Sequence, residues 1–119
     1  MGDDRALLFD TGPGVRDIAP VVSSLTDLPV TVTQSHLHFD HVGNHDKFSN
    51  IVFPDLEHLR RLEMKDDSKG AISLSSSQHL GFVENIETPK ITVTNWQNPN
   101  EEIDLGNRKI KMIQLYLWI

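Results

Sequence analysis

Three histidines and an aspartate lie within six consecutive positions of the stretch Ser-His-Leu-His-Phe-Asp-His-Val-Gly-Asn, residues 35 to 44. The four side chains are His36, His38, Asp40 and His41. In extended backbone, alternate side chains face the same way, so His36 and His38 can point together at one ion. If the chain bends at Phe39, Asp40 and His41 can offer an oxygen and a nitrogen to a second ion. The spacing therefore predicts a two-metal site on one loop.

A pair of metal ions held in this way would serve hydrolysis. Water that bridges two divalent cations loses a proton near neutral pH, and the metal-bound hydroxide attacks a carbonyl that the metals also polarise. Asp40 is therefore a candidate catalytic residue as well as a ligand. The chain has no cysteine, so histidine, carboxylate and water must hold any metal, and that donor set accepts zinc, iron or manganese. The alternative is a histidine-rich loop that hydrogen-bonds to its own backbone and binds nothing.

Four short strands are expected, and one of them leads into the histidines. Residues 5 to 10 form an apolar run closed by Gly-Pro-Gly, which predicts a buried strand ending at Asp10. Valines alternate with threonines within residues 28 to 35, which predicts a second strand running directly into the cluster. Residues 51 to 53 and 90 to 95 indicate two further strands. The histidine loop should therefore lie at the carboxyl end of a strand.

Two helices are expected between these strands. Residues 15 to 25 carry apolar side chains at helical spacing, with Asp17 as a cap and Pro20 in the first turn, where proline is tolerated. A second helix opens at Pro54 and Asp55. The leucines on one of its sides are Leu56, Leu59 and Leu62.

The remaining segments are a loop, a hairpin and an apolar end. Residues 65 to 78 are polar, contain a serine run and break every period, which indicates a surface loop or lid, or a disordered segment. A hairpin is expected to turn at Gly106 and Asn107. Residues 115 to 119, Leu-Tyr-Leu-Trp-Ile, require a buried or partner-covered strand, because such a segment would aggregate if exposed.

Composition limits the classes of protein that the chain can be. The 119 residues are enough for one domain with a real core. No stretch approaches the roughly 18 apolar residues that span a bilayer, and the start lacks the features of a secretory signal. The net charge of −6 disfavours binding to nucleic acid, which needs a basic surface. We expect a cytoplasmic protein that acts on a small molecule, without nucleic acid or membrane as a partner.

The cluster resembles the signature of the metallo-β-lactamase superfamily, an H-x-H-x-D-H loop that follows a strand. The upstream Leu-Leu-Phe-Asp-Thr-Gly-Pro-Gly is similar to the family's strand ending in Asp-Thr-Gly. Gly43 follows the last histidine as it does in the family, and residues 101 to 113 resemble the hairpin that precedes the family's next ligand. The residues of these motifs most resemble those of the glyoxalase II-like branch and of hydrolases of thioesters and lactones.

The resemblance implies a set of site residues. His36 and His38 would bind a first zinc, and Asp40 and His41 a second. Asp10 would stand behind these ligands and brace the loop, although an aspartate that starts a tight turn at a strand end is an equal interpretation. Three histidines are expected not to be primary ligands, namely His45, which would cap or hydrogen-bond locally, His58 and His79.

The resemblance also implies the fold and an incomplete ligand set. We expect an α+β fold, half of a four-layer αββα sandwich with a mixed sheet and flanking helices, as one partial domain over residues 1 to 119. The family supplies a third histidine to the first metal from a Pro-Gly-His turn after the hairpin, then a bridging aspartate and a final histidine, and these three are not found here. Two ligands per metal are too few for tight binding.

Two hypotheses follow. The first is a zinc-dependent hydrolase of an ester, thioester or lactone, seen here as a fragment or acting as an assembled dimer in which a second copy covers the open sheet face. The second is a truncated, inactive derivative of the fold that serves as a binding or assembly module.

Overall fold

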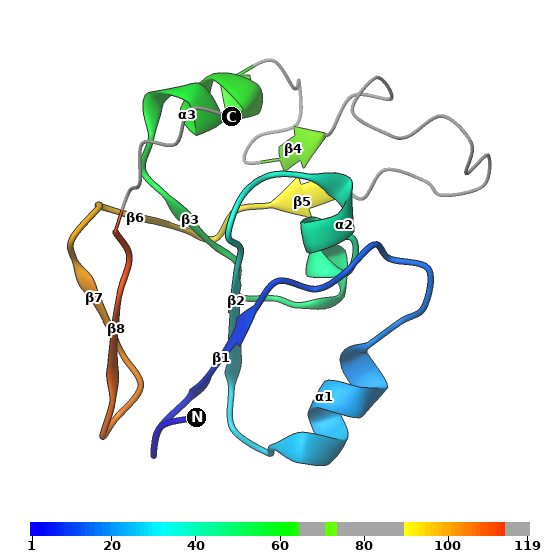
Figure 1. Cartoon of the computed structure of the whole chain (residues 1–119), viewed down its shortest axis with the longest axis vertical. Coiled ribbons are helices and arrows are strands. Elements are labelled where there is room, and N and C mark those ends of the chain that lie inside the picture. The colour runs from blue at the N-terminus through cyan, green and yellow to red at the C-terminus, as the bar shows by residue number, and fades with distance from the viewer. Residues whose placement is uncertain (65–70, 74–89, 114–119) are drawn as a thin grey trace.

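The structure is a computed structural model that describes residues 1–64, 71–73 and 90–113 (Figure 1). Its elements up to residue 64 are β1 (Ala6–Phe9), α1 (Ala19–Leu25), β2 (Val30–Thr33), α2 (Phe39–Val42), a 3₁₀ turn η1 (His45–Lys47), β3 (Val52–Pro54) and α3 (Glu57–Met64). The later elements are β4 (Ala71–Ser73), β5 (Lys90–Thr92), β6 (Asn95–Gln97), β7 (Glu102–Asp104) and β8 (Lys109–Lys111). The predicted α+β class, with parallel and antiparallel strands and flanking helices, is confirmed.

Parallel strands form the centre of the molecule. β1 pairs with β2 from Ala6 opposite Val30 to Phe9 opposite Thr33. A parallel bridge between Val32 and Ile51 joins β2 to the start of β3, and β6 pairs in parallel with β3. Because parallel strands end at the same edge, the segments that follow β1 and β2 emerge side by side (Figure 1). This edge carries the histidine loop.

The core lies on both faces of β3. Successive side chains of a strand point to opposite faces, and here both faces are covered. On one face Phe53 is buried with Ile51, Val42, Leu59 and Ile91. On the other face Val52 is buried with Ile103 and Leu105 of the hairpin that β7 and β8 form. β3 therefore lies between the cluster that holds Val42 of the histidine loop and the cluster that holds the hairpin.

The first helix is shorter than predicted and packs loosely. It begins at Ala19 with Pro20 in its first turn, as expected, but none of its residues is buried. Ile18 occupies the N-cap position, one residue after the predicted Asp17. The Asp17 carboxylate nevertheless accepts a hydrogen bond from the Ala19 amide at 2.9 Å, so it does satisfy a free amide of the first turn.

The expected single strand over residues 90 to 95 is wrong, because the chain changes partner within it. β5 pairs antiparallel with β4, whereas β6 pairs with β3. At the break, the Thr94 hydroxyl accepts a hydrogen bond from the Ile51 amide at 2.8 Å and donates one to the Ile51 carbonyl at 2.9 Å. The Thr94 side chain thus bonds to both backbone groups of Ile51 at the start of β3, where the Thr94 amide also donates to the Ile51 carbonyl at 2.9 Å.

The polar segment from 65 to 78 is not entirely loop, since it contains β4, which pairs with β5. Sequence periodicity could not show this strand, because its three residues are held by an antiparallel partner rather than by an amphipathic pattern of their own. The rest of that segment and residues 115 to 119 lie outside the described residues.

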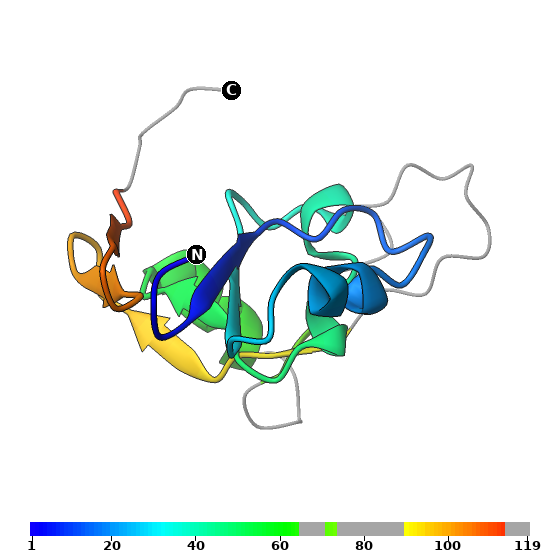
Figure 2. The ribbon, with the colours of Figure 1, turned by 90° about the horizontal axis from the view of Figure 1, so that it is seen from below.

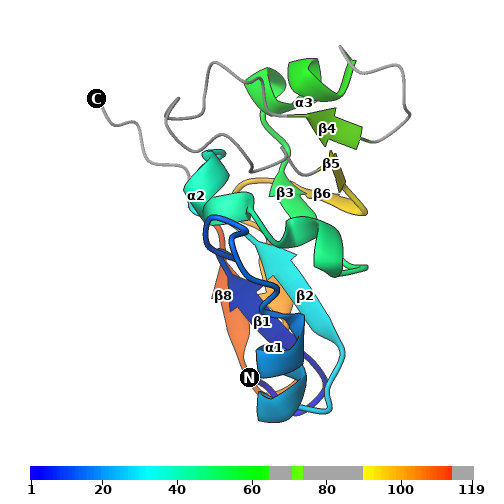
Figure 3. The ribbon, with the colours of Figure 1, turned by 90° about the vertical axis from the view of Figure 1, so that its right-hand side faces the viewer.

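The predicted hairpin turn is confirmed. The Leu105 amide donates to the Arg108 carbonyl at 2.8 Å, which leaves Gly106 and Asn107 as the two-residue loop. Gly106 has a φ of 113°, a backbone conformation that residues other than glycine rarely adopt. The hairpin lies beside β1 and β2 rather than over the histidine loop, as Figures 1, 2 and 3 show from three sides.

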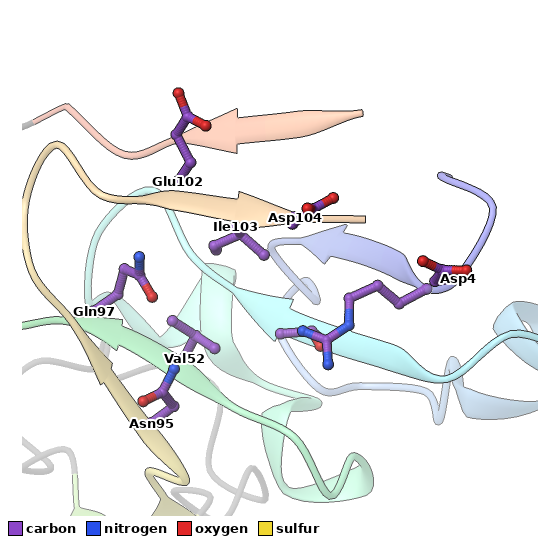
Figure 4. Close-up of a pocket in the computed structure, with 9 residues that line it drawn as sticks. Asp4, Val52, Asn95, Gln97, Glu102, Ile103 and Asp104 are labelled. Carbon is purple, nitrogen blue, oxygen red and sulfur yellow. The ribbon is translucent and has the colours of Figure 1, made fainter. Parts of the chain in front are cut away.

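A cavity of about 460 Å³ lies between this hairpin and the central strands (Figure 4). Val52 and Ile103 face each other within it, and polar side chains such as Asn95, Gln97 and Asp4 line its rim. No residue from 35 to 44 lines it. The candidate metal site is therefore separate from this cavity.

No helix within the described part of the chain is long and apolar enough to cross a membrane.

Replacing Thr94 by valine should destabilise the start of β3. The change removes the hydroxyl and leaves the buried Ile51 amide without its acceptor, which should cost about 1 to 3 kcal/mol in the free energy of unfolding. Urea denaturation checks this, with Thr92→Val as the control, because Thr92 is exposed like Thr94 but lies within neighbouring β5. Equal stability of the two variants would show that the Thr94 hydroxyl does not stabilise the start of β3.

Candidate metal centre

The histidine loop leaves β2 as extended chain and then turns sharply. His38 is extended, with φ −120° and ψ 152°, and α2 begins at the next residue. The predicted bend at Phe39 is thus confirmed. Val42, in the last position of α2, is fully buried in the core. The loop is therefore anchored at both ends, by β2 before it and by Val42 after it.

The four predicted ligand residues lie together. The ring of His36 lies 4.5 Å from that of His38 and 4.0 Å from that of His41, measured between ring centroids. Asp40 Oδ2 lies 3.6 Å from His41 Nε2. His36 is thus as close to the predicted second pair as to its own partner, so the side chains form one cluster rather than two separate pairs.

This cluster is not arranged as a finished metal site. Among the residues that the structure describes, no group of three or more histidine and carboxylate side chains is arranged to hold a metal ion. The donor chemistry nevertheless suits zinc, because imidazole and carboxylate are its usual ligands in the absence of cysteine. The assignment of His36, His38, Asp40 and His41 as ligands therefore stays a prediction.

Asp10 is the residue that ties the cluster to the sheet. Its carboxylate accepts hydrogen bonds from the Ser35 amide at 2.8 Å, from the Ser35 hydroxyl at 3.0 Å and from His41 Nδ1 at 2.9 Å. Partial burial would raise the pKa of Asp10, but the hydrogen bonds from His41 and Ser35 outweigh it and hold the pKa below its usual value. The carboxylate is therefore ionised and accepts only, so His41 Nδ1 carries a proton.

The backbone of Asp10 is in the left-handed region, with a φ of 62°. Aspartate tolerates this conformation better than most residues. The predicted role of Asp10 behind the ligands stays a prediction until a metal is measured. Its contacts with Ser35 and His41 are those that such a role requires, because an aspartate that only started a turn would not need to reach either residue.

Ser35 is a site residue that the sequence analysis missed. Its hydroxyl lies 2.9 Å from His36 Nδ1 and 3.2 Å from His41 Nδ1. Since the hydroxyl donates its only proton to Asp10, His36 Nδ1 must donate to it. The sequence carries no local signal for Ser35, because the parallel pairing of strands that end at Phe9 and Thr33 brings residues 10 and 35 together only in the folded chain.

The two tethered imidazoles present the nitrogen that a metal needs. With Nδ1 bound to Asp10 or Ser35, the Nε2 atoms of His41 and His36 keep their lone pairs. Partial burial, followed by repulsion from His41 and His38, lowers the pKa of His36. A neutral ring is the form that binds a metal.

The loop after β1 is joined to the histidine loop by backbone contacts. The Thr11 amide donates to the His41 carbonyl and the Gly43 amide donates to the Gly12 carbonyl, both at 2.8 Å. Asn44 Nδ2 donates to the carbonyls of Thr11 and Arg16, both at 3.0 Å. Gly43 is packed so closely that a Cβ there would collide with the backbone of the preceding loop. The site thus has a rigid base built from two loops.

The other histidines are placed as follows. His45 is fully buried, and both of its ring nitrogens have partners, with Nδ1 lying 2.8 Å from the Thr11 hydroxyl and Nε2 lying 3.0 Å from Gln34 Oε1. His58 is exposed on α3. His79 lies outside the described residues. The expectation that His45 caps or hydrogen-bonds locally is therefore wrong, because its partners lie 34 and 11 positions away in the sequence. That His45 is not a primary metal ligand stays a prediction.

A comparison with protein families agrees with this geometry. The family model of the metallo-beta-lactamase superfamily matches residues 2–111. The chain therefore belongs to the metallo-beta-lactamase superfamily. No curated protein and no solved structure matches the chain.

Gly43→Ala should destabilise the protein, contrary to the usual effect of alanine. Gly43 has a helical φ of −62°, where alanine normally stabilises by about 0.5 to 1 kcal/mol. Here the added methyl group would press on the backbone of Pro13 and Gly14, so we expect a loss of about 1 to 3 kcal/mol. Thermal and urea unfolding measure it.

The matched control is Gly12→Ala in the facing loop. Its φ is 73°, but no heavy atom lies within 4 Å of the added Cβ, so only the backbone cost of about 1 kcal/mol applies. A Gly43→Ala protein more stable than wild type would show that the two loops are not in contact.

The buried His45 should make the protein less stable in acid. Burial lowers the pKa of His45 from 6.5 to about 4, against the opposing charge of Asp10. Between pH 6.5 and pH 4 the unfolded chain therefore binds a proton that the folded chain does not. The stability that this ring contributes is fully present above the higher value and is lost as pH falls to the lower one, by about 3 kcal/mol.

Urea unfolding of chelator-treated protein across that pH range measures the loss. A His45→Gln variant, which has no titrating ring, should show a shallower decline with falling pH than wild type. Parallel curves for the two proteins would contradict the assigned burial of His45.

Proposed function

We propose that the chain binds zinc through His36, His38, Asp40 and His41 and hydrolyses an ester, thioester or lactone, in the manner of the glyoxalase II-like branch. Membership of the metallo-beta-lactamase superfamily suggests a metal-dependent hydrolase. The observation that carries the proposal is the hydrogen bond that protonated His41 Nδ1 donates to the ionised Asp10. It leaves the lone pair of His41 Nε2 available to a metal ion.

The cluster has the electrostatics that a cation requires. Asp10 and Asp40 place two carboxylates beside His41, and the pKa of neighbouring His36 is lowered by partial burial and by repulsion from His41 and His38. A divalent ion would bind the lone pairs of neutral rings and would be attracted by the two carboxylates. His36 and His38 are both exposed, so an ion and a substrate can reach them from solvent.

Zinc, when bound, would supply an activated water as nucleophile and polarise the substrate's carbonyl. The residues of the chain then divide the remaining work. The half-exposed Asp40 carboxylate, beside His41 Nε2, can hold a proton released by the attacking water. Asp10 and Ser35 keep His36 and His41 in the orientation and tautomer that ligation demands.

The described residues do not complete a ligand set, so the proposal needs more donors. The rings of His36 and His38 lie in a T-shaped arrangement and would have to turn towards a common point. Further ligands would come from residues outside the described part or from a second copy of the chain, for which a homo-oligomer covering the open sheet face is the simplest arrangement.

Metal content per chain after dialysis tests the proposal. We expect zinc to remain bound, and a His36→Ala and His38→Ala double variant to lose about 100-fold or more in zinc affinity, because two of the ligands are gone. Zinc competition against a chromophoric chelator gives the affinity. Hydrolysis of an aryl ester, a thioester and a lactone by the zinc-loaded protein gives the substrate class.

His58→Ala is the control, since it also removes a histidine but from exposed α3. It should leave zinc affinity unchanged. A wild-type chain that retains no zinc, or a His58→Ala loss equal to that of the double variant, would contradict the proposed site and favour the inactive binding module.

A further inference from the structure

His45 occupies a position that the proposed chemistry does not use. Its side chain has no solvent exposure, and both ring nitrogens are taken up by protein side chains. The Thr11 hydroxyl is 2.8 Å from Nδ1, and Gln34 Oε1 is 3.0 Å from Nε2. A carboxamide oxygen can only accept, so Nε2 donates to Gln34 and Nδ1 accepts from Thr11.

The two partners of His45 are the neighbours of the residues that hold the cluster. Thr11 directly follows Asp10, and Gln34 directly precedes Ser35. The His45 ring therefore spans the ends of β1 and β2 next to the point where Asp10 accepts hydrogen bonds from Ser35. One ring thus fixes the spacing between the two chain segments that hold the imidazoles.

The bridge continues into the histidine loop. The Thr11 hydroxyl also accepts a hydrogen bond from the Asn44 amide at 3.0 Å, and the Thr11 amide donates to the His41 carbonyl at 2.8 Å. A shift of Thr11 would move His41 as well as Asp10. The side-chain nitrogens and oxygens buried here all have partners within the described part of the molecule, so loss of the ring would leave polar groups unpaired.

We propose that His45 is a positioning residue for the metal site, a buried bridge between Thr11 and Gln34 that sets the contact of Asp10 with Ser35 and His41. The inference rests on the proposed zinc site for its effect on affinity, but not for its effect on the protein without metal. His45 acts through hydrogen bonds to other residues and contacts neither metal nor substrate.

The test compares His45→Leu with His45→Gln. Leucine fills much of the volume but makes neither hydrogen bond, whereas glutamine can accept from Thr11 and donate to Gln34. In the metal-free protein, His45→Leu should speed hydrogen exchange of the Ser35 amide, which donates to Asp10 Oδ1, by about ten-fold or more. Zinc affinity should fall by about 10- to 100-fold. His45→Gln should restore both.

Thr33→Val separates positioning from general stability. Thr33 is buried on β2 and donates to the Val52 carbonyl at 3.0 Å, so its loss removes a buried hydrogen bond next to the bridge but not part of it. This variant should lose stability while the exchange of Ser35 and the zinc affinity stay as in wild type. If His45→Leu fails to fold, Gln34→Leu breaks the β2 side of the bridge and should give the same two changes.

The outcomes separate this inference from the proposed function. Unchanged Ser35 exchange in a folded His45→Leu or Gln34→Leu protein overturns the bridge, whatever the wild-type protein does with zinc. An equal change in Thr33→Val overturns it as well, because the effect would then be one of stability alone. If the wild-type chain binds no zinc, the proposed function is contradicted. If Ser35 exchange is nevertheless faster in His45→Leu than in wild type, the bridge is supported.

Discussion

The Asp10 carboxylate at the end of β1 is the group on which the site depends. It accepts from the Ser35 amide and hydroxyl and from His41 Nδ1, and so joins β1, the end of β2 and the start of the short helix. Its left-handed backbone costs about 1 to 2 kcal/mol. Hydrogen bonds to an ionised acceptor, at about 1.5 to 3 kcal/mol each, offset that cost. These hydrogen bonds therefore stabilise a backbone conformation that Asp10 would otherwise rarely adopt.

The site combines a fixed backbone with accessible donors. Val42 is buried in the core, Gly43 packs against the loop after β1, and Asn44 is hydrogen-bonded to Thr11 and Arg16. Of the side chains that extend from this base, those of His36, His38 and Asp40 are exposed. Such a division suits a metal centre, because the main chain holds the spacing of the ligands while their rings remain open to an ion.

Local patterns were sufficient wherever one segment settles its own structure. The strand before Asp10, the turn at Phe39 and the hairpin at Gly106 follow from apolar runs and turn residues, and all three are observed. The strand, however, ends at Phe9 rather than Asp10, and only Ala6 in it is buried. Sequence patterns were insufficient where a partner strand determines whether and where a strand forms. Residues 90 to 95 alternate like one strand but divide between two partners, and β4 exists because β5 pairs with it. Pairing energy depends on the partner strand and cannot be read from the segment alone.

The types of the candidate ligands, their order and the bend between them are already present in residues 36 to 41, because spacing along a short extended segment and a turn is a local property. The supporting residues are different. Asp10 lies 31 positions from His41, and His45 lies 34 positions from Thr11. Ser35 and His45 have no distinguishing pattern in the chain. Their roles arise because the register of two parallel strands and the burial of one ring place distant polar groups within hydrogen-bond distance, and those are properties of the folded chain.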